Sequence, residues 1–161
     1  MTAQTDSKHL KRCIELATQA LALGNDPFGS LIVSEDGNVL FEDYNRTANG
    51  NDTRHPELAI ALWAAEHMTP EERAKAIVYT SGEHCAMCSA AHAWAGLGKI
   101  IYAGSTEQLT QWMTELNAPS IPIKPLAIKD VTVNIDTEGP FPEFAEELRE
   151  LHRKNYFRKN S

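Results

Sequence analysis

The stretch IVYTSGEHCAMCSAAHAW (residues 77–94) joins a short apolar run to a tight turn and a segment that begins with two cysteines. Ile77–Thr80 is typical of a buried strand. The turn at residues 81–84 follows at once, and Cys85–Trp94 has the composition of a helix that ends before Gly96. A strand, a tight turn and a helix in direct succession predict one unit of an α/β fold.

The flanking segments continue this alternation. Helical spacing of apolar residues from Ser7 to Gly24 predicts a helix with Ser7 as its N-cap. Over the rest of the chain we expect helices at 55–68, 106–117 and 142–156, a short helical turn at 69–72, and strands at 28–34, 39–44, 99–103 and 131–135. This order predicts an α/β fold, a three-layer α-β-α sandwich around a mixed five-stranded sheet, in a single domain over residues 1–161.

Composition narrows the function classes. The chain has 161 residues, 42% of them hydrophobic, and is long enough to form one core. Its 15 basic and 22 acidic residues give a net charge of −7, which disfavours nucleic acid and anionic membranes as partners. No apolar run approaches the roughly 20 residues of a membrane span, and Met1–Lys8 is polar, so we expect a cytoplasmic protein. Three cysteines do not suggest a disulfide framework, and Cys13 is expected to be a small buried residue.

Two short motifs carry the chemistry, Cys85-Ala86-Met87-Cys88 and His55-Pro56-Glu57, each at the start of an expected helix. Thiolate and imidazole are zinc ligands, and a three-residue step on a helical turn lets two sulfurs bind the same ion. The helix N-terminus lowers the pKa of such thiols. Three protein ligands leave a fourth position for water, as in catalytic zinc sites. Glu57, two residues beyond His55, can accept a proton from that water.

Two other interpretations of the cysteines stay open. Cys85 and Cys88 have the spacing of a redox pair, although a redox pair does not need His55. They also fit a structural zinc site with His92, one helical turn after Cys88, as the fourth ligand. The protein would then be a non-catalytic, zinc-stabilised binding domain.

The two motifs, about 30 residues apart, resemble the zinc signature of the cytidine-deaminase-like superfamily. The likeness is to its small nucleobase and nucleoside deaminases, among them guanine deaminases, fungal-type cytosine deaminases and tRNA adenosine deaminases. It extends from Asp26-Pro27-Phe28-Gly29 to Lys99–Ala103. Two residues depart from the family pattern: Pro56 replaces the usual Ala after the zinc-binding histidine, and His84 replaces the usual Pro before the first cysteine.

This resemblance implies a Zn²⁺-dependent hydrolase that deaminates a free nucleobase or nucleoside and releases ammonia. His55, Cys85 and Cys88 would hold the zinc, and Glu57 would transfer protons. Guanine or a related purine is the favoured substrate, with cytosine, a pterin or a triazine as alternatives. A tRNA adenosine substrate would need a basic face, and the chain is acidic overall. Homodimers are common among these deaminases, and we expect one here.

The resemblance also assigns substrate contacts. Asn45, ten residues before the zinc-binding histidine, would hold the base, unless it only caps its own polar loop. Trp94 would shape the base pocket and Phe28 would form part of its floor, although either side chain can instead pack in the core. In the turn before the first cysteine, Glu83 would contact the substrate through its backbone and His84 through its side chain, unless His84 only faces solvent.

Three further residues are implied by guanine-specific relatives. Glu115 would be a second proton-transfer residue. Tyr156 or Phe157 would close the active site, in a C-terminal tail at about 153–161 that acts as a lid or exchanges between subunits.

Overall fold

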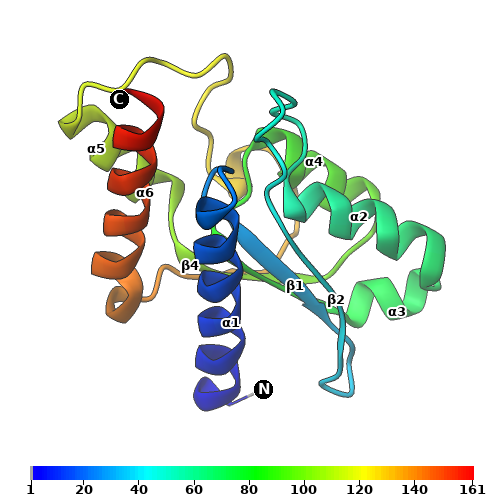
Figure 1. Ribbon diagram of the computed structural model, residues 1–161. Coiled ribbons are helices and arrows are strands. Elements are labelled where there is room, and N and C mark those ends of the chain that lie inside the picture. Colours follow the sequence, from blue (N-terminus) through cyan, green and yellow to red (C-terminus); the bar gives the residue numbers. More distant parts are fainter. Residues whose placement is uncertain (1) are drawn as a thin grey trace.

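The computed structural model describes residues 2–161 (Figure 1). In chain order the elements are α1 (Ala3–Ala22), β1 (Gly29–Val33), β2 (Val39–Tyr44), α2 (Pro56–His67), α3 (Pro70–Lys75), β3 (Ile77–Gly82), α4 (Ala86–Trp94), β4 (Lys99–Gly104), α5 (Thr106–Glu115), the 3₁₀ turn η1 (Ile128–Asp130), β5 (Thr137–Glu138), the 3₁₀ turn η2 (Pro142–Phe144) and α6 (Ala145–Lys159).

The five strands form one mixed sheet in the order β2-β1-β3-β4-β5. β1 pairs antiparallel with both β2 and β3, whereas β3–β4 and β4–β5 are parallel. α4 makes the crossover between β3 and β4, as the strand, turn and helix at residues 77–94 predict. The expected α/β class with a mixed five-stranded sheet is confirmed.

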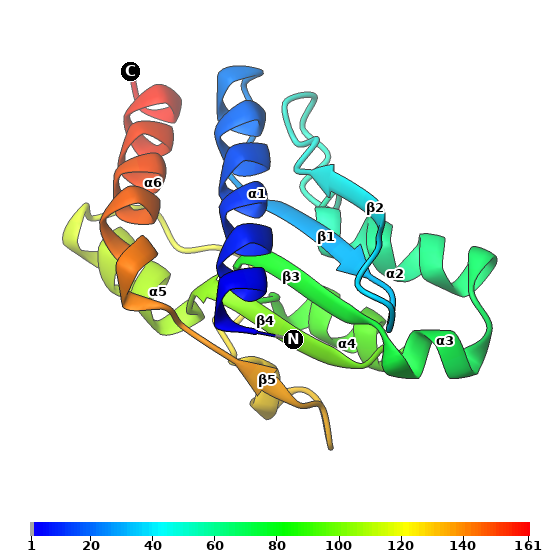
Figure 2. The same ribbon diagram turned by 90° about the horizontal axis from the view of Figure 1, so that it is seen from below.

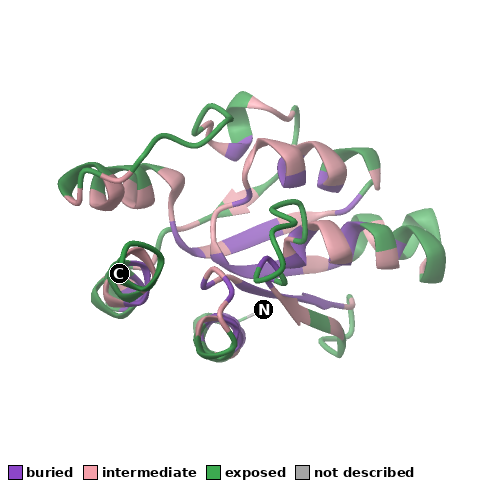
Figure 3. Cartoon of the chain, turned by 45° about the horizontal axis from the view of Figure 1, so that its top comes forward, coloured by how far each residue is buried: buried purple, intermediate pink, exposed green. Residues whose placement is uncertain are grey.

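Helices cover both faces of the sheet (Figures 2 and 3). Leu31 and Val33 of β1 belong to a core with α1 and α6, and Cys13 lies fully buried in it, as expected. Ile32, between them in sequence, belongs to a second core with α2. Successive side chains of a strand point to opposite faces, so β1 is apolar throughout because both of its faces are covered.

One edge of the sheet collects the segments that carry the expected site. Because β1 is antiparallel to its two neighbours, its start lies beside the ends of β2 and β3. The end of β4 joins them through the paired residues Gly82 and Gly104. The loops after β2 and β3 and the loop before β1 therefore meet at this edge.

One expected helix boundary and one expected strand are wrong. α1 begins at Ala3 rather than near Ser7, because the Thr2 hydroxyl accepts a hydrogen bond from Thr5 N and forms the N-cap. No strand forms at 131–135, although apolar and polar residues alternate there. The Thr132 amide and hydroxyl both donate to the Ile128 carbonyl and close a turn, and Val133 is 83% exposed. The last strand is instead the short β5.

The C-terminal helix also differs from expectation. Pro142–Phe144 forms a 3₁₀ turn, and α6 runs from Ala145 through Lys159, so the residues expected to be a basic tail are helical. Arg158 and Lys159 lie in the last turn, where positive charge stabilises the C-terminal end of the helix dipole. Within residues 2–161 no helix has the length and apolar character needed to cross a bilayer.

The packing of α1 on β1 predicts a strong effect of substituting Gly29. A Cβ atom there would overlap the Cys13 carbonyl and lie 2.5 Å from Leu16 Cβ. We expect Gly29→Ala to lower the free energy of unfolding by about 3 kcal/mol, measured by urea titration. Gly50→Ala is the control: nothing lies within 4 Å of the new Cβ, and the positive φ of 91° alone should cost about 1 kcal/mol. Equal losses in the two variants would contradict this packing.

Candidate metal and catalytic site

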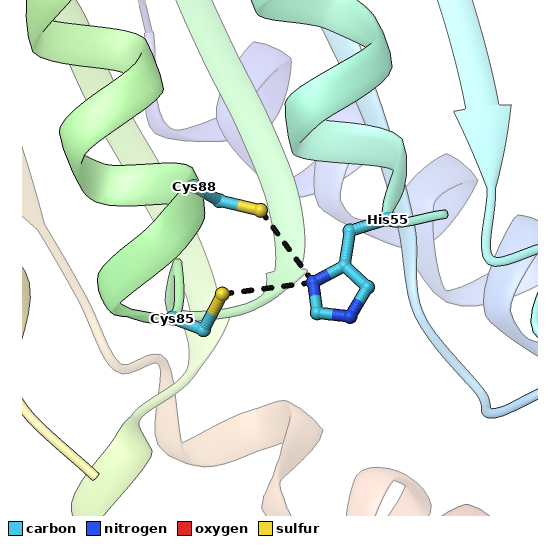
Figure 4. A group of neighbouring side chains, drawn as sticks. All are labelled: His55, Cys85 and Cys88. Carbon is cyan, nitrogen blue, oxygen red and sulfur yellow. Dashed lines mark hydrogen bonds between the residues drawn. The ribbon is translucent and has the colours of Figure 1, made fainter. Parts of the chain in front are cut away.

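Three metal-binding side chains meet at the N-termini of α2 and α4 (Figure 4). His55 is the N-cap residue of α2, Cys85 is the N-cap residue of α4, and Cys88 follows in the first turn of α4. His55 Nδ1 lies 3.6 Å from Cys85 Sγ and 3.5 Å from Cys88 Sγ. Pro56 occupies the first position of α2, where a missing amide hydrogen costs nothing, so this departure from the family pattern is compatible with the site.

The geometry and the donor set fit zinc. A tetrahedral zinc ion, about 2.3 Å from sulfur and about 2.1 Å from nitrogen, separates its ligand atoms by about 3.5–3.8 Å. The potential ligand atoms of His55, Cys85 and Cys88 all lie within 4.8 Å of one another. Two thiols and one imidazole are a common zinc set, and three protein ligands leave one coordination position for water or substrate.

The charges of these side chains are coupled. A hydrogen bond from Cys88 lowers the pKa of the Cys85 thiol to about 4, with a further contribution from His55. Cys85 and burial raise the pKa of Cys88, so this thiol holds its proton. Burial alone would lower the pKa of His55, but Cys85 and Glu57 raise it. A metal ion that binds both sulfurs therefore replaces the Cys88 proton.

Glu57 lies in the first turn of α2, next to these ligands. Its side chain is buried, and burial raises its pKa. The hydroxyls of Ser30 and Thr80 lie 3.1 and 3.0 Å from Glu57 Oε1 and fix that oxygen. A carboxylate whose pKa is raised by burial is a better proton acceptor than an exposed one.

Sequence analysis missed Ser30 and Thr80. Both are fully buried, on β1 and β3, and they are direct cross-strand partners whose hydroxyl oxygens lie 2.8 Å apart. A polar residue within an otherwise apolar strand was the available signal, because a buried hydroxyl needs a partner. The identity of that partner depends on strand register and on the position of α2.

Asn45 follows β2 and is only 1% exposed. Its backbone amide donates to the Phe28 carbonyl, which fixes the residue. Both polar atoms of its side chain lack a hydrogen-bond partner among the described residues. A buried amide left in this way costs about 1–3 kcal/mol per group, so Asn45 is equipped to bind a ligand with complementary donors and acceptors.

The Glu83 carboxylate is engaged by the backbone. It accepts hydrogen bonds from Thr106 N at 3.0 Å and from Ile128 N at 2.8 Å, and so joins the β3–α4 turn to α5 and η1. The Glu83 amide donates to the Gly104 carbonyl. The backbone contact with substrate that is expected of Glu83 is left to its carbonyl group, because its amide and its carboxylate are both engaged.

His84 and His92 form a buried pair behind the ligands. Their rings meet edge to face at 5.4 Å, and both ring nitrogens of His84 are buried without a partner among residues 2–161. Burial lowers the pKa of His84 well below its usual value. His92 Nε2 lies 2.7 Å from the Gly98 carbonyl, and His92 is outside the cluster of metal-binding atoms. The structure thus does not place His92 as a fourth zinc ligand.

Four other expected residues lie in less enclosed positions. Trp94 ends α4, at the end opposite the cysteines, and is 91% exposed in the single chain. Glu115 forms a 2.8 Å ion pair with Arg149 between α5 and α6. Tyr156 and Phe157 stack edge to face on α6, with Phe157 half exposed. A single chain therefore does not enclose Trp94 in a pocket.

Residues 3–104 match the family model described as the cytidine and deoxycytidylate deaminase zinc-binding region. The chain belongs to this deaminase family. The match includes both motifs and the loop with Asn45, so the zinc-binding function assigned to His55, Cys85 and Cys88 agrees with the family.

Individual members of the family differ in their substrates. The chain is 37% identical to a probable cytosine deaminase of Schizosaccharomyces pombe over 108 residues, 66% of this chain and 65% of the relative. It is 35% identical to guanine deaminase of Bacillus subtilis over 96 residues, 58% of this chain and 61% of the relative. These matches therefore span less than two thirds of the relatives' lengths.

A likeness in three dimensions covers more of the chain. A protein solved in complex with 2,6-diaminopurine superposes with a TM-score of 0.68 over 94% of this chain and 82% of its own. The sequence identity is 19%, so this comparison shows the common fold.

The site predicts different roles for the cysteines. We expect Cys88→Ser to lose most bound zinc, because the hydroxyl is a much weaker ligand than a thiolate. Cys13→Ala is the matched control: Cys13 lies on the buried face of α1, in the core on the opposite side of the sheet from α2, so its substitution should leave the zinc content unchanged. Metal analysis of the purified proteins measures both. Full zinc retention by Cys88→Ser would contradict the assigned ligand set.

Proposed function

We propose that the protein catalyses the zinc-dependent hydrolytic deamination of a free nucleobase, most favourably guanine or a related purine, and releases ammonia. The observation that carries this proposal is the buried carboxyl group of Glu57 beside three zinc ligands that leave a coordination position open. Glu57 and the ligands are close enough to shift one another's pKa. A structural zinc site would need neither the open position nor the buried carboxyl group.

In this proposal His55, Cys85 and Cys88 would hold Zn²⁺, and the bound ion would supply Lewis acidity that lowers the pKa of water to near neutral pH. Water adds to the ring carbon that bears the exocyclic amine. Glu57 accepts a proton from this water and delivers it to the adjacent ring nitrogen. Glu57 then transfers the second proton to the amine, the carbon–nitrogen bond breaks, ammonia leaves and a carbonyl group remains.

The environment of Glu57 suits both of these proton transfers. A carboxyl group of ordinary pKa stays ionised near pH 7 and is a poor acid, whereas burial raises the pKa of Glu57. Ser30 and Thr80 hold Oε1, which restricts rotation of the carboxyl group and orients its other oxygen. Transfer of a proton twice by one group requires such a fixed orientation.

Asn45 supports a nucleobase as the substrate. The edge of a nucleobase carries adjacent hydrogen-bond donors and acceptors, and an amide side chain is complementary to both. The buried, unpaired amide of Asn45 would regain its hydrogen bonds when such a ligand binds. Guanine is favoured because the chain is similar to a guanine deaminase and has an Asn ten residues before His55.

Cytosine is the second candidate, favoured by the 37% identity to a probable cytosine deaminase. A tRNA substrate is less well supported, even though tRNA-specific adenosine deaminases are also among the relatives. Three of the five basic residues of α6 form close ion pairs with acidic side chains: Arg149 with Glu115, Arg153 with Glu150, and Lys159 with Asp26. With a net charge of −7, the chain offers little attraction to a phosphate backbone.

The proposal includes a homodimer formed through α2 and α4. These helices pack side by side on one face of the sheet. Leu62 on α2 is 60% exposed and Trp94 on α4 is 91% exposed, which is unusual for large apolar side chains on neighbouring helices. A second copy would cover them, and Trp94 would then be buried at the interface.

The test is ammonia release by the zinc-loaded protein from guanine, cytosine, adenine, guanosine, cytidine and a pterin. We expect release from guanine and a loss of at least about 10³-fold in kcat for Glu57→Gln with zinc retained. Glu66→Gln, an exposed change on the same helix, is the control and should leave kcat unchanged. Release from cytosine alone would establish the second candidate. No release from any compound by protein with bound zinc would reject a nucleobase deaminase.

The contact between Thr80 and Glu57 gives a separate prediction. Thr80→Val removes one hydroxyl with little change of shape, so Glu57 Oε1 loses a hydrogen bond in a buried site. We expect kcat to fall about tenfold or more, because a hydrogen bond to a charged group contributes about 1.5–3 kcal/mol. Thr114→Val, whose hydroxyl only bonds to its own helix, is the control. An unchanged kcat with normal zinc content would show that Thr80 does not orient Glu57.

A further inference from the structure

The last turn of α6 contacts Asp26, in the loop between α1 and β1. Lys159 Nζ lies 2.6 Å from Asp26 Oδ1, and Asn155 Nδ2 donates to the same oxygen at 3.0 Å. Asp26 is largely buried, with 20% of its side chain exposed. Burial would raise the pKa of Asp26, but Lys159, Asn155 and Arg158 lower it, so the carboxylate keeps its charge for this contact.

The loop that contains Asp26 in turn holds the loop that contains Asn45. Asp26 N donates to Thr47 Oγ1 at 3.2 Å, and Ala48 N donates to Asn25 Oδ1 at 2.8 Å. Asn45 N donates to the Phe28 carbonyl at 3.1 Å. Residues 25–28 and 45–48 are therefore joined by three hydrogen bonds and should move together.

Phe28 gives α6 a second contact with this region. Its ring lies 5.1 Å from the ring of His152 on α6. The ring also packs against Gly82, where an added Cβ would come within 3.1 Å of Phe28 Cε1. Phe28 thus contacts both α6 and the end of β3, just before the turn that leads to the zinc ligand Cys85.

We propose that the C-terminal turn of α6 is a clamp, formed by Asn155 and Lys159 on Asp26, that positions the loop with Asn45 for binding the base. This inference rests on the proposed function for its catalytic consequence. Asn155 and Lys159 are positioning residues and need not touch the substrate. The zinc ligands and Glu57 lie on α2 and α4, which the clamp does not contact directly, so the clamp acts on substrate binding rather than on the proton transfers.

The clamp also accounts for the helical C-terminus. The residues of the expected C-terminal tail continue α6 through Lys159, and the last turn of this helix is held by Asp26 of the same chain. An ion pair at this point stabilises the observed position of the two loops, and in this proposal loss of the pair lowers the fraction of molecules in the binding-competent state.

Lys159→Ala, Asp26→Asn and the double variant test the clamp, with Lys154→Ala, an exposed change in the same helix, as control. Hydrogen exchange at the amides of Asn45 and Ala48 is the first readout. We expect about threefold to tenfold faster exchange in Lys159→Ala, with β3 amides unchanged. If both amides in Lys159→Ala exchange at the rates of the wild-type protein, the clamp is overturned.

The second readout is KM and kcat for guanine, or for cytosine if that base is the one deaminated. We expect KM to rise about threefold to tenfold in each single variant, with kcat and zinc content unchanged. The double variant should be no worse than the more affected single variant, because both remove the same ion pair. Faster exchange with unchanged KM, or additive effects on KM, would overturn the positioning role.

The two readouts separate this inference from the proposed function. If the wild-type protein deaminates none of the bases, the proposed function fails, and the exchange rates of Asn45 and Ala48 still decide whether α6 fixes the loop. If guanine is deaminated normally by Lys159→Ala, the proposed function stands and the positioning role fails.

Discussion

Helices α2 and α4 begin at the same edge of the sheet, and the other features of the site depend on this constraint. Each helix starts where a strand or its loop ends, so their N-terminal residues His55 and Cys85 face each other. Cys88 adds a second sulfur from the first turn of α4. Packing between two helices thereby brings together ligands 30 residues apart in sequence, and no flexible loop has to close on the metal.

Burial of polar groups has a cost that the fold offsets only in part. Glu57 is compensated by two strand hydroxyls, whereas the Asn45 amide and the His84 ring have no partner among the described residues. Uncompensated groups of this kind are concentrated at functional sites, because a ligand can supply the missing hydrogen bonds. The same burial raises the pKa of Glu57 above that of an exposed carboxyl group, a shift that is common at functional sites.

The two faces of the sheet serve different parts of the site. On one face, α2 and α4 carry the zinc ligands and Glu57. On the other, α1 and α6 support the loop before β1, and through it the loop with Asn45. In the proposed function, chemistry and base recognition would therefore depend on different layers, and a change in α6 would alter binding while the metal site stays intact.

The sequence by itself determined the helices and strands that have a local pattern of apolar residues, and the metal ligands that have a fixed spacing along the chain. Cys85 and Cys88 are one turn apart on any helix, and apolar periodicity located β1, β3 and α2. The strand expected at 131–135 failed because alternation is meaningful only when one face is covered, and Val133 has no such cover. Only the tertiary structure decided that Ser30 pairs with Thr80 beneath Glu57, that Glu83 binds two distant backbone amides, and that Lys159 reaches Asp26. These contacts join residues 23–133 positions apart, and no local pattern specifies them, because they depend on strand register and on how the helices pack.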